Sequence, residues 1–155
     1  MLQQPIYSIG IRLIPETFLI LYSICLLTNT KADFKKISVA AVIGGIGVYI
    51  TRLMPIHFGV HTIILVMFDI FLAVKLLKVH IYKAIAGSLI AVVICFASEI
   101  ILIYIYTKLF QFGSDIVLGQ SLLSIVAGFP SLIIFYIIIK IVVHFIGKRV
   151  WHEHN

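Results

Sequence analysis

Five long apolar runs divide this chain and constrain its fold more than any other feature. Several hold about 18 or more residues with few charges, the length that a helix needs to cross a bilayer core of roughly 30 Å. Of the 155 residues, 62% are hydrophobic and 12% are charged, against about 45–50% and about 25% in typical globular chains. The runs lack the alternation of barrel strands, and helices satisfy their own backbone groups in lipid. We therefore expect an all-α, polytopic transmembrane helix bundle of about five spans.

The spans are delimited by short polar connections. We expect them within Pro5–Thr28, at Ile37–Leu53, at Gly59–Leu77, at Ala84–Thr107 and within Val117–Ile146. Because no Pro/Ser-rich linker or convincing repeat separates them, a single transmembrane domain over residues 1–155 is expected. The first residues lack the basic region and cleavage site of a secretory signal peptide.

The last apolar run is too long for one simple span. Val117–Ile146 would extend about 45 Å as a helix, and Gly128 and Pro130 lie in its middle. Proline removes a backbone donor and clashes with the preceding turn. We therefore expect a kink or break near Gly128–Pro130, with Gly119–Ala127 as a separate helical piece.

The net charge of +6 is distributed over the connections between the runs. Nucleic-acid binding would require basic residues massed on one face, whereas short clusters beside apolar runs follow the positive-inside rule. With five spans, one side receives Lys31, Lys35, Lys36, Lys75, Lys78, Lys83, Lys140, Lys148 and Arg149, and the other receives Arg12, Arg52 and Lys108. We therefore expect a cell-membrane protein in contact with the lipid bilayer and not with nucleic acid. Its N-terminus would lie outside and its C-terminus in the cytoplasm.

Small residues recur four apart in the second span. The two pairs are Ala40 with Gly44 and Ala41 with Gly45. Such spacing lets helix backbones approach closely in lipid. The pattern predicts a helix-packing face whose partner lies in the same chain or in another protein or copy.

Three acidic residues lie inside apolar runs, where a charge is costly and indicates a functional site by default. They are Glu16, Asp69 and Glu99. At about 1.5 Å per residue, Asp69 lies about 15 Å and Glu99 about 13 Å from the outer ends of their spans. Glu16 also falls in the outer half, so the three carboxyl groups are expected in the same half of the bilayer.

One interpretation of these acids is an outward-facing polar cavity. Its cationic partners would be Arg12, Arg52 and His61. Arg12 and Glu16 are four residues apart and share a helix face if the helix continues through Pro15. The alternative is structural, with buried ion pairs or with carboxyls that stay protonated in apolar surroundings. The string Ile14–Thr17 (IPET) also resembles a helix start, with proline first and an acid in the first turn.

His57 and His61 have the spacing that puts two metal ligands on one helix face. A zinc site needs a third or fourth ligand, and the stretch lacks the glutamate of the HExxH signature. Pro55 and Gly59 are expected to break the helix here. The favoured interpretation is a polar turn at the headgroup level, with pH sensing as an alternative, and no metal site is expected.

The sequence contains no recognisable catalytic constellation. No nucleophile–base pair or phosphate loop is evident, and the GGIG string at Gly44–Gly47 does not follow a strand, so neither an enzyme nor a cofactor is expected. Cys25 and Cys95 lack Cys-x-x-Cys spacing and are expected to behave as small apolar residues.

Three strings carry a resemblance to a known family: Ile14–Thr17 (IPET), Arg52–Thr62 (RLMPIHFGVHT) and Gly128–Pro130 (GFP). Together they resemble the N-terminal membrane module of sensor histidine kinases of Gram-positive, spore-forming bacteria, which carry a GHKL-type ATPase after it. The resemblance covers nearly the whole chain and implies an outward-facing receptor module of five or six spans whose last helix passes a signal on. The phosphoacceptor segment and ATP-binding domain of those kinases do not follow Trp151–Asn155, so no catalytic residue is carried over.

These features predict a non-enzymatic membrane protein of sensor type. It would bind an external ligand in the outer-half cavity and signal through its last helix to a membrane or cytoplasmic partner or to a second copy. A small transporter subunit is the first alternative, because intramembrane carboxyls also suit proton-coupled transport. An assembly protein that uses its small-residue helix faces is the second.

Overall fold

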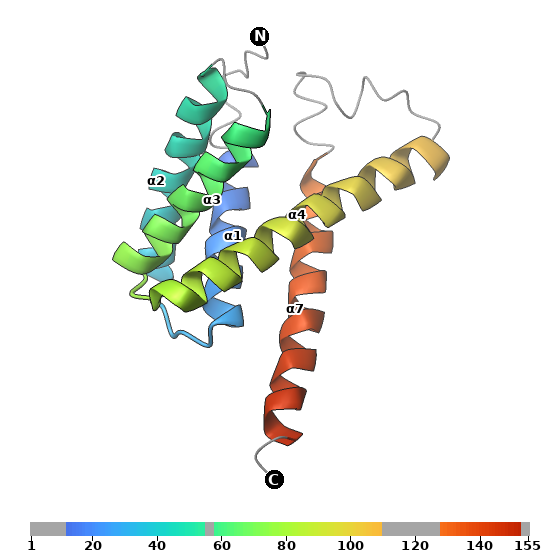
Figure 1. The fold of residues 1–155 in the computed structure, drawn as a ribbon. Helices are drawn as coiled ribbons and strands as arrows, with labels where there is room; N and C mark the ends of the chain where they lie inside the picture. The colour runs from blue at the N-terminus through green and yellow to red at the C-terminus, as the bar shows by residue number, and fades with distance from the viewer. Residues whose placement is uncertain (1–11, 55–57, 110–127, 153–155) are drawn as a thin grey trace.

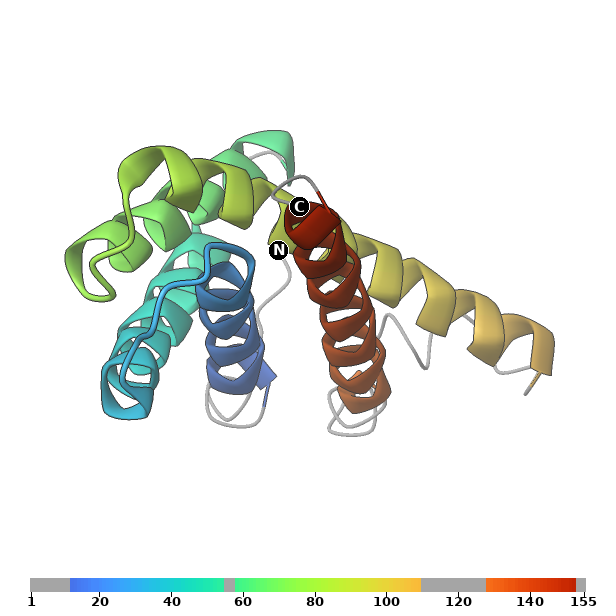
Figure 2. The same cartoon turned by 90° about the horizontal axis from the view of Figure 1, so that it is seen from below.

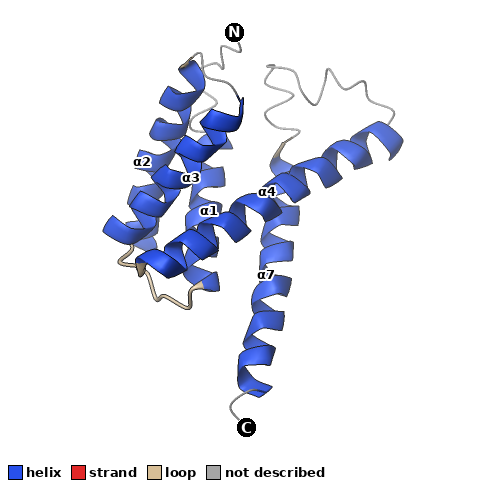
Figure 3. Ribbon diagram, viewed as in Figure 1, coloured by secondary structure: helices blue, strands red, loops and turns tan. Residues whose placement is uncertain are grey.

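The computed structural model describes residues 12–54, 58–109 and 128–152, and these form helices without a strand. The helices are α1 (Ile14–Leu27), α2 (Phe34–Leu53), α3 (Phe58–Lys75), α4 (Ile81–Leu109) and α7 (Phe129–His152) (Figure 1 and Figure 3). The all-α expectation is therefore confirmed, and each helix overlaps one of the predicted spans.

The short turns between helices have local causes in the sequence. Asp33 caps α2, its side chain accepting a hydrogen bond from the Lys35 backbone N–H at 3.4 Å, as an N-cap residue does. Asn29 and Lys78 follow α1 and α3 with φ of 51° and 59°. A left-handed residue just past a helix end lets the chain turn back. Helices adjacent in sequence consequently run in opposite directions.

Two of the described helices are long and apolar enough to cross a membrane, namely Phe34–Leu53 and Ile81–Lys108. Ile14–Leu27 and Phe129–Phe145 are shorter apolar helices. Large apolar side chains point outward, among them Met67, Val93, Ile100 and Ile133, each 63–67% exposed. By length and composition, α2 and α4 fit a membrane protein.

Helix α1 is central to the packing. It contacts each of the other four described helices and lies between α2 and α7 (Figure 1 and Figure 2). Leu21 and Ile24 of α1 are fully buried and join one apolar cluster with Leu72 of α3 and Phe135 and Ile139 of α7. Helix α4 crosses this group obliquely and packs against α1, α3 and α7.

The small-residue face of α2 packs against α1 of the same chain. Ala40, Ala41, Gly44 and Gly45 are all buried. A Cβ at Gly44 would overlap the Thr17 side chain, and a Cβ at Gly45 would lie 3.3 Å from the Ile14 backbone. The small-residue face that the sequence predicted therefore packs within the chain. Of the two partners that the sequence allowed, a helix of the same chain or one of another protein or copy, the structure shows the first.

The two expected breaks differ in detail from the prediction. Helix α2 ends at Leu53 and α3 begins at Phe58, while Pro55 and His57 lie outside the described residues. A continuous helix through this stretch is excluded, as predicted, because α2 ends at Leu53 with Met54 as its C-cap. Gly59 itself, however, lies in the first turn of α3 and not in the break. An exposed helical glycine costs only about 1 kcal/mol relative to alanine, which α3 tolerates.

The predicted break near Gly128–Pro130 coincides with a helix start. Gly128 forms a turn and α7 begins at Phe129, with Pro130 in the first turn, where its missing N–H leaves no helical bond unmade. A kink would need helix on both sides. Gly119–Ala127 lies outside the described residues, so the kink and the separate helical piece stay predictions.

Candidate functional site

A cavity of about 450 Å³ lies between α1, α2, α3 and α4. Its polar lining consists of Glu16, Thr17, Arg52, His61, Thr62, Asp69, Cys95 and Glu99. The rest of the wall is apolar and includes Leu13, Ile20, Val48, Met54, Leu65, Val66, Val92 and Phe96. Its volume is in the range of small-molecule sites, which typically have a mostly apolar wall and a few polar groups.

Helical spacing explains how the lining residues converge. On α3, His61, Leu65 and Asp69 follow each other at intervals of four residues. On α4, Cys95 and Glu99 show the same interval. Residues four apart lie on one helix face, so each helix presents a continuous stripe to the cavity.

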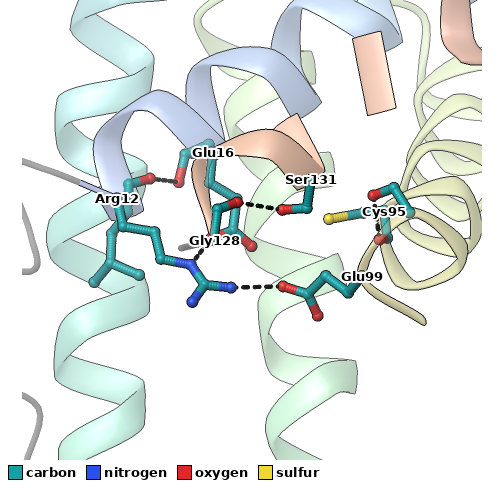
Figure 4. A network of polar contacts seen from close by, with 9 residues as sticks. Arg12, Glu16, Cys95, Glu99, Gly128 and Ser131 are labelled. Carbon is teal, nitrogen blue, oxygen red and sulfur yellow. Dashed lines mark hydrogen bonds and ion pairs between the residues drawn. The ribbon is translucent and has the colours of Figure 1, made fainter. Parts of the chain in front are cut away.

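Arg12 connects two of the carboxyl groups. It lies in the π-helical turn just before α1, and its guanidinium Nη2 donates to Glu99 Oε1 at 2.8 Å. Its Nε lies 3.8 Å from Glu16 Oε2, as expected for residues four apart on one helix face. Figure 4 shows Arg12 reaching from α1 toward Glu99 on α4. Both carboxyls line the cavity, so Arg12 fixes the position of two acids in its polar wall.

The same guanidinium lies against Gly128. A Cβ at this position would be 3.0 Å from Arg12 Nη1 and 3.1 Å from Cζ, so the absence of a side chain lets the charged group approach. The Ser131 hydroxyl donates to the Gly128 carbonyl oxygen at 2.6 Å and fixes the turn that leads into α7 (Figure 4). The beginning of α7 is thereby in contact with the network that lines the cavity.

Asp69 differs from the other two acids. It is 6% exposed and lines the cavity, yet among residues 12–54, 58–109 and 128–152 no hydrogen bond or ion pair to it is formed. Glu16 Oε2 is also buried without a hydrogen-bond partner in this part of the chain, although Arg12 is near. Burying a charged group costs much unless it is paired. The cavity thus holds carboxylate oxygens that can accept bonds from a ligand.

The structure brings the residues predicted from sequence together. Glu16, Asp69, Glu99, Arg52 and His61 all line the cavity, and Arg12 contacts two of the acids. Arg12 forms ion pairs with Glu16 and Glu99, as the structural interpretation expected. His57 lies outside the described residues, and within these no group of three or more His, Cys, Asp or Glu side chains is placed to hold a metal.

Sequence reasoning missed Cys95 and Thr17. Both line the cavity. Cys95 is four residues before Glu99, and Thr17 directly follows Glu16, and both of these acids were predicted from the sequence. The interval of four between Cys95 and Glu99 was the available signal. Thr17 donates its hydroxyl to the Leu13 carbonyl oxygen at 2.8 Å, so it satisfies itself within α1.

Comparisons with family models, with curated proteins and with solved structures find no match for this chain. The chain is described by its all-α fold, by two apolar helices of membrane-crossing length and by the cavity.

Proposed function

We propose that the chain is a multi-pass membrane protein of sensor type, which binds an external ligand in the cavity and reports it through α7. The observation that carries this proposal is the chain of contacts from the cavity to α7. Glu99 lines the cavity, Arg12 bonds to Glu99, and Arg12 lies against Gly128 at the start of α7. A ligand group that binds Glu99 competes with Arg12 and so acts on the turn that begins α7.

The positions of the turns support a multi-pass arrangement. Figure 1 shows the α1–α2 turn, the α3–α4 turn and the C-terminal end of α7 at one end of the structure. Lys31 and Lys78 lie in these turns, with further lysines in the first turns of α2 and α4. The positive-inside rule assigns this end to the cytoplasm. Arg52 and His61 then lie toward the outside, and the cavity opens in the outer half.

The resemblance to the membrane modules of sensor kinases suggests how a bound ligand would be reported. In membrane modules of GHKL-type kinases, which the sequence resembles, the last helix leads toward the signalling domain. Here α7 would pass a change to a protein partner or to a second copy. Differential contacts in two states are what allow a ligand to shift such an equilibrium, and the Arg12–Glu99 bond is a contact that a ligand can replace.

The test is ligand binding to the full chain in nanodiscs. Thermal unfolding is followed while fractionated culture-medium extract is titrated in. We expect one or more fractions to stabilise the protein saturably, since binding to the folded state raises the free energy of unfolding. Asp69→Asn and Glu99→Gln should abolish the shift, and Asp33→Asn, outside the cavity, should keep it. The absence of a saturable shift with every fraction would overturn the proposal.

A transporter subunit is the second candidate, and Asp69 favours it. A carboxyl that is 6% exposed near the middle of an apolar helix is typical of proton and ion pathways. Uptake into vesicles that depends on Asp69 or Glu99 would support transport over sensing. An assembly role based on the small-residue face has no such support, because α1 fills that face.

A further inference from the structure

Asp69 is the carboxyl of the cavity that no described cation neutralises. Arg12 bonds to Glu99 and lies beside Glu16, whereas the described ranges place no ion pair on Asp69. Asp69 is also 6% exposed and faces the cavity. A buried carboxylate in this position gains most from a ligand that carries a positive charge.

The basic residues of the cavity lie away from Asp69. His61 is two helical turns before Asp69 on α3, a separation of about 12 Å along the axis. Arg52 is in the last turn of α2, the end that Figure 1 shows beside the start of α3. By contrast, a second acid, Glu16, lines the cavity together with Asp69. Arg12 lies beside Glu16 and Glu99, whereas Arg52 and His61 lie toward the other end of the cavity, so Asp69 is left without an ion pair among the described residues.

The remaining wall limits what the rest of a ligand can be. The cavity wall includes aliphatic side chains such as Leu65, Val66 and Val92 and the aromatic ring of Phe96. Such a wall favours an apolar body, and an aromatic face also attracts ammonium groups. The volume of about 450 Å³ admits a small molecule of several rings or two short side chains of a peptide.

We infer that the ligand is an organic cation with an apolar body, whose ammonium or guanidinium group pairs with Asp69 and approaches Glu16. The inference rests on the proposed function and names the ligand class of the same cavity. It covers free amines and the basic side chain of a short peptide alike, because both present the same group to Asp69.

Cys95 provides a native reporter for this charge preference. It lines the cavity on the same face of α4 as Glu99, and the other cysteine, Cys25, is buried outside the cavity lining. In nanodiscs, the Cys25→Ala protein is treated with methanethiosulfonates that carry a trimethylammonium or a sulfonate group. In each reaction the Cys95 thiolate displaces methanesulfinate and forms a mixed disulfide. Both reagents use the same thiolate, so its ease of ionisation cancels in the ratio of rates.

We expect the cationic reagent to react at least about tenfold faster than the anionic one, after division by the ratio measured with 2-mercaptoethanol. Clefts lined by one sign of charge raise rates for the opposite sign by about 10–10³-fold. Asp69→Asn should bring the ratio close to one. Asp33→Asn should leave it unchanged, since Asp33 is exposed at the cap of α2 and asparagine caps equally well.

A second arm tests reversible binding with matched ligands. Protection of Cys95 from neutral methyl methanethiosulfonate is measured with 4-phenylbutylammonium, 4-phenylbutanol and 5-phenylpentanoate. The ammonium compound should protect at a concentration at least about tenfold lower than the other two, and Asp69→Asn should remove the difference. Protection by the carboxylate instead, or by none of them, overturns the ligand class while the cavity remains a site. Failure of the neutral reagent to reach Cys95 at all would overturn the proposed function itself.

Discussion

Arg12 Nη2 lies 2.8 Å from Glu99 Oε1, so the turn before α1 is bonded to the second half of α4 across 87 residues of chain. The same guanidinium lies against Gly128 and close to Glu16. One side chain thus joins three segments that are distant in the sequence. Two of its partners line the cavity, and the third, Gly128, is the turn residue that precedes α7.

Loss of Arg12 should destabilise the fold. Arg12→Gln leaves Glu16 and Glu99 without their cation, and the side chains of this pair are only 24% and 33% exposed. Hydrogen bonds to charged groups contribute about 1.5–3 kcal/mol, and we expect a loss of this order in the free energy of unfolding, measured in detergent micelles. Lys108→Gln, at an exposed position near the end of α4, should change it by less than about 0.5 kcal/mol.

The double variant Arg12→Gln/Glu99→Gln measures the interaction between the two residues apart from the effect of each single substitution. Removing both partners leaves less unpaired charge than removing one. We expect the double variant to be clearly less destabilised than the sum of the two single variants. Strict additivity would show that the two residues do not interact.

Gly44 should be intolerant of even one added methyl group. A Cβ there overlaps the Thr17 side chain, whereas a Cβ at Gly59 meets no atom within 4 Å. Gly44→Ala should therefore lower the midpoint of thermal unfolding, because overpacking costs about 1–3 kcal/mol. Gly59→Ala should leave it unchanged or raise it, because alanine favours the helix by about 1 kcal/mol.

The same pair of variants tests where the small-residue face packs. The contact of Gly44 and Gly45 with α1 predicts that Gly44→Ala changes stability without changing the size of the particle in size-exclusion chromatography. A shift in oligomeric state at unchanged stability would place this face at a contact between chains instead.

Much of the fold could be predicted because the local signals are strong. The apolar runs predicted the helices, and Ile14–Thr17 predicted the start of α1 with its acidic first turn. The spacing of Arg12 and Glu16 gave their pairing. Glu16, Asp69 and Glu99 were found because each is an acid within an apolar run, and their similar depth predicted that they meet.

The remaining features depend on contacts that no local pattern encodes. The bond between Arg12 and Glu99 requires knowing how α4 crosses α1. The four-residue spacing in α2 predicts close packing but is identical for a partner helix in the same chain or in another. Gly59 was expected to interrupt the helix together with Pro55, whereas it lies in the first turn of α3. Cys95 is an ordinary apolar residue in sequence, and its place in the cavity wall follows from the orientation of α4.

Gly128 is expected to matter through Arg12 and not through its own backbone. None of the described glycines has a positive φ, so alanine is conformationally acceptable at this position. Its Cβ would lie 3.0 Å from Arg12 Nη1, and the guanidinium would have to shift. Gly128→Ala should therefore cost about 1 kcal/mol in the wild-type background, measured by thermal unfolding.

The cost should largely disappear when Arg12 is already glutamine, because the displaced group is then absent. This non-additivity is measured with the double variant Arg12→Gln/Gly128→Ala. An equal effect of Gly128→Ala in both backgrounds would mean that the substitution acts on the turn before α7 alone. The proposed route from cavity to α7 would then lose its second contact.

The orientation in the membrane can be tested with two cysteines on opposite ends of α2. Lys31 is exposed in the turn that precedes α2, and Met54, which follows it, is 55% exposed. In a Cys25→Ala/Cys95→Ala background, intact cells are treated with a membrane-impermeant maleimide. Met54→Cys should be labelled directly, and Lys31→Cys only after permeabilisation, because the positive-inside rule predicts the lysine-rich turns on the cytoplasmic side.

Tyr82, 85% exposed near the start of α4, supplies an independent check. Tyr82→Cys lies at the same end as Lys31 and should share its protection in intact cells. Labelling of Lys31→Cys and Met54→Cys from the same side would mean that α2 does not cross the membrane. The opposite pattern, with Lys31→Cys and Tyr82→Cys labelled directly, would keep the spans but turn the cavity toward the cytoplasm, and the proposed ligand would then be internal.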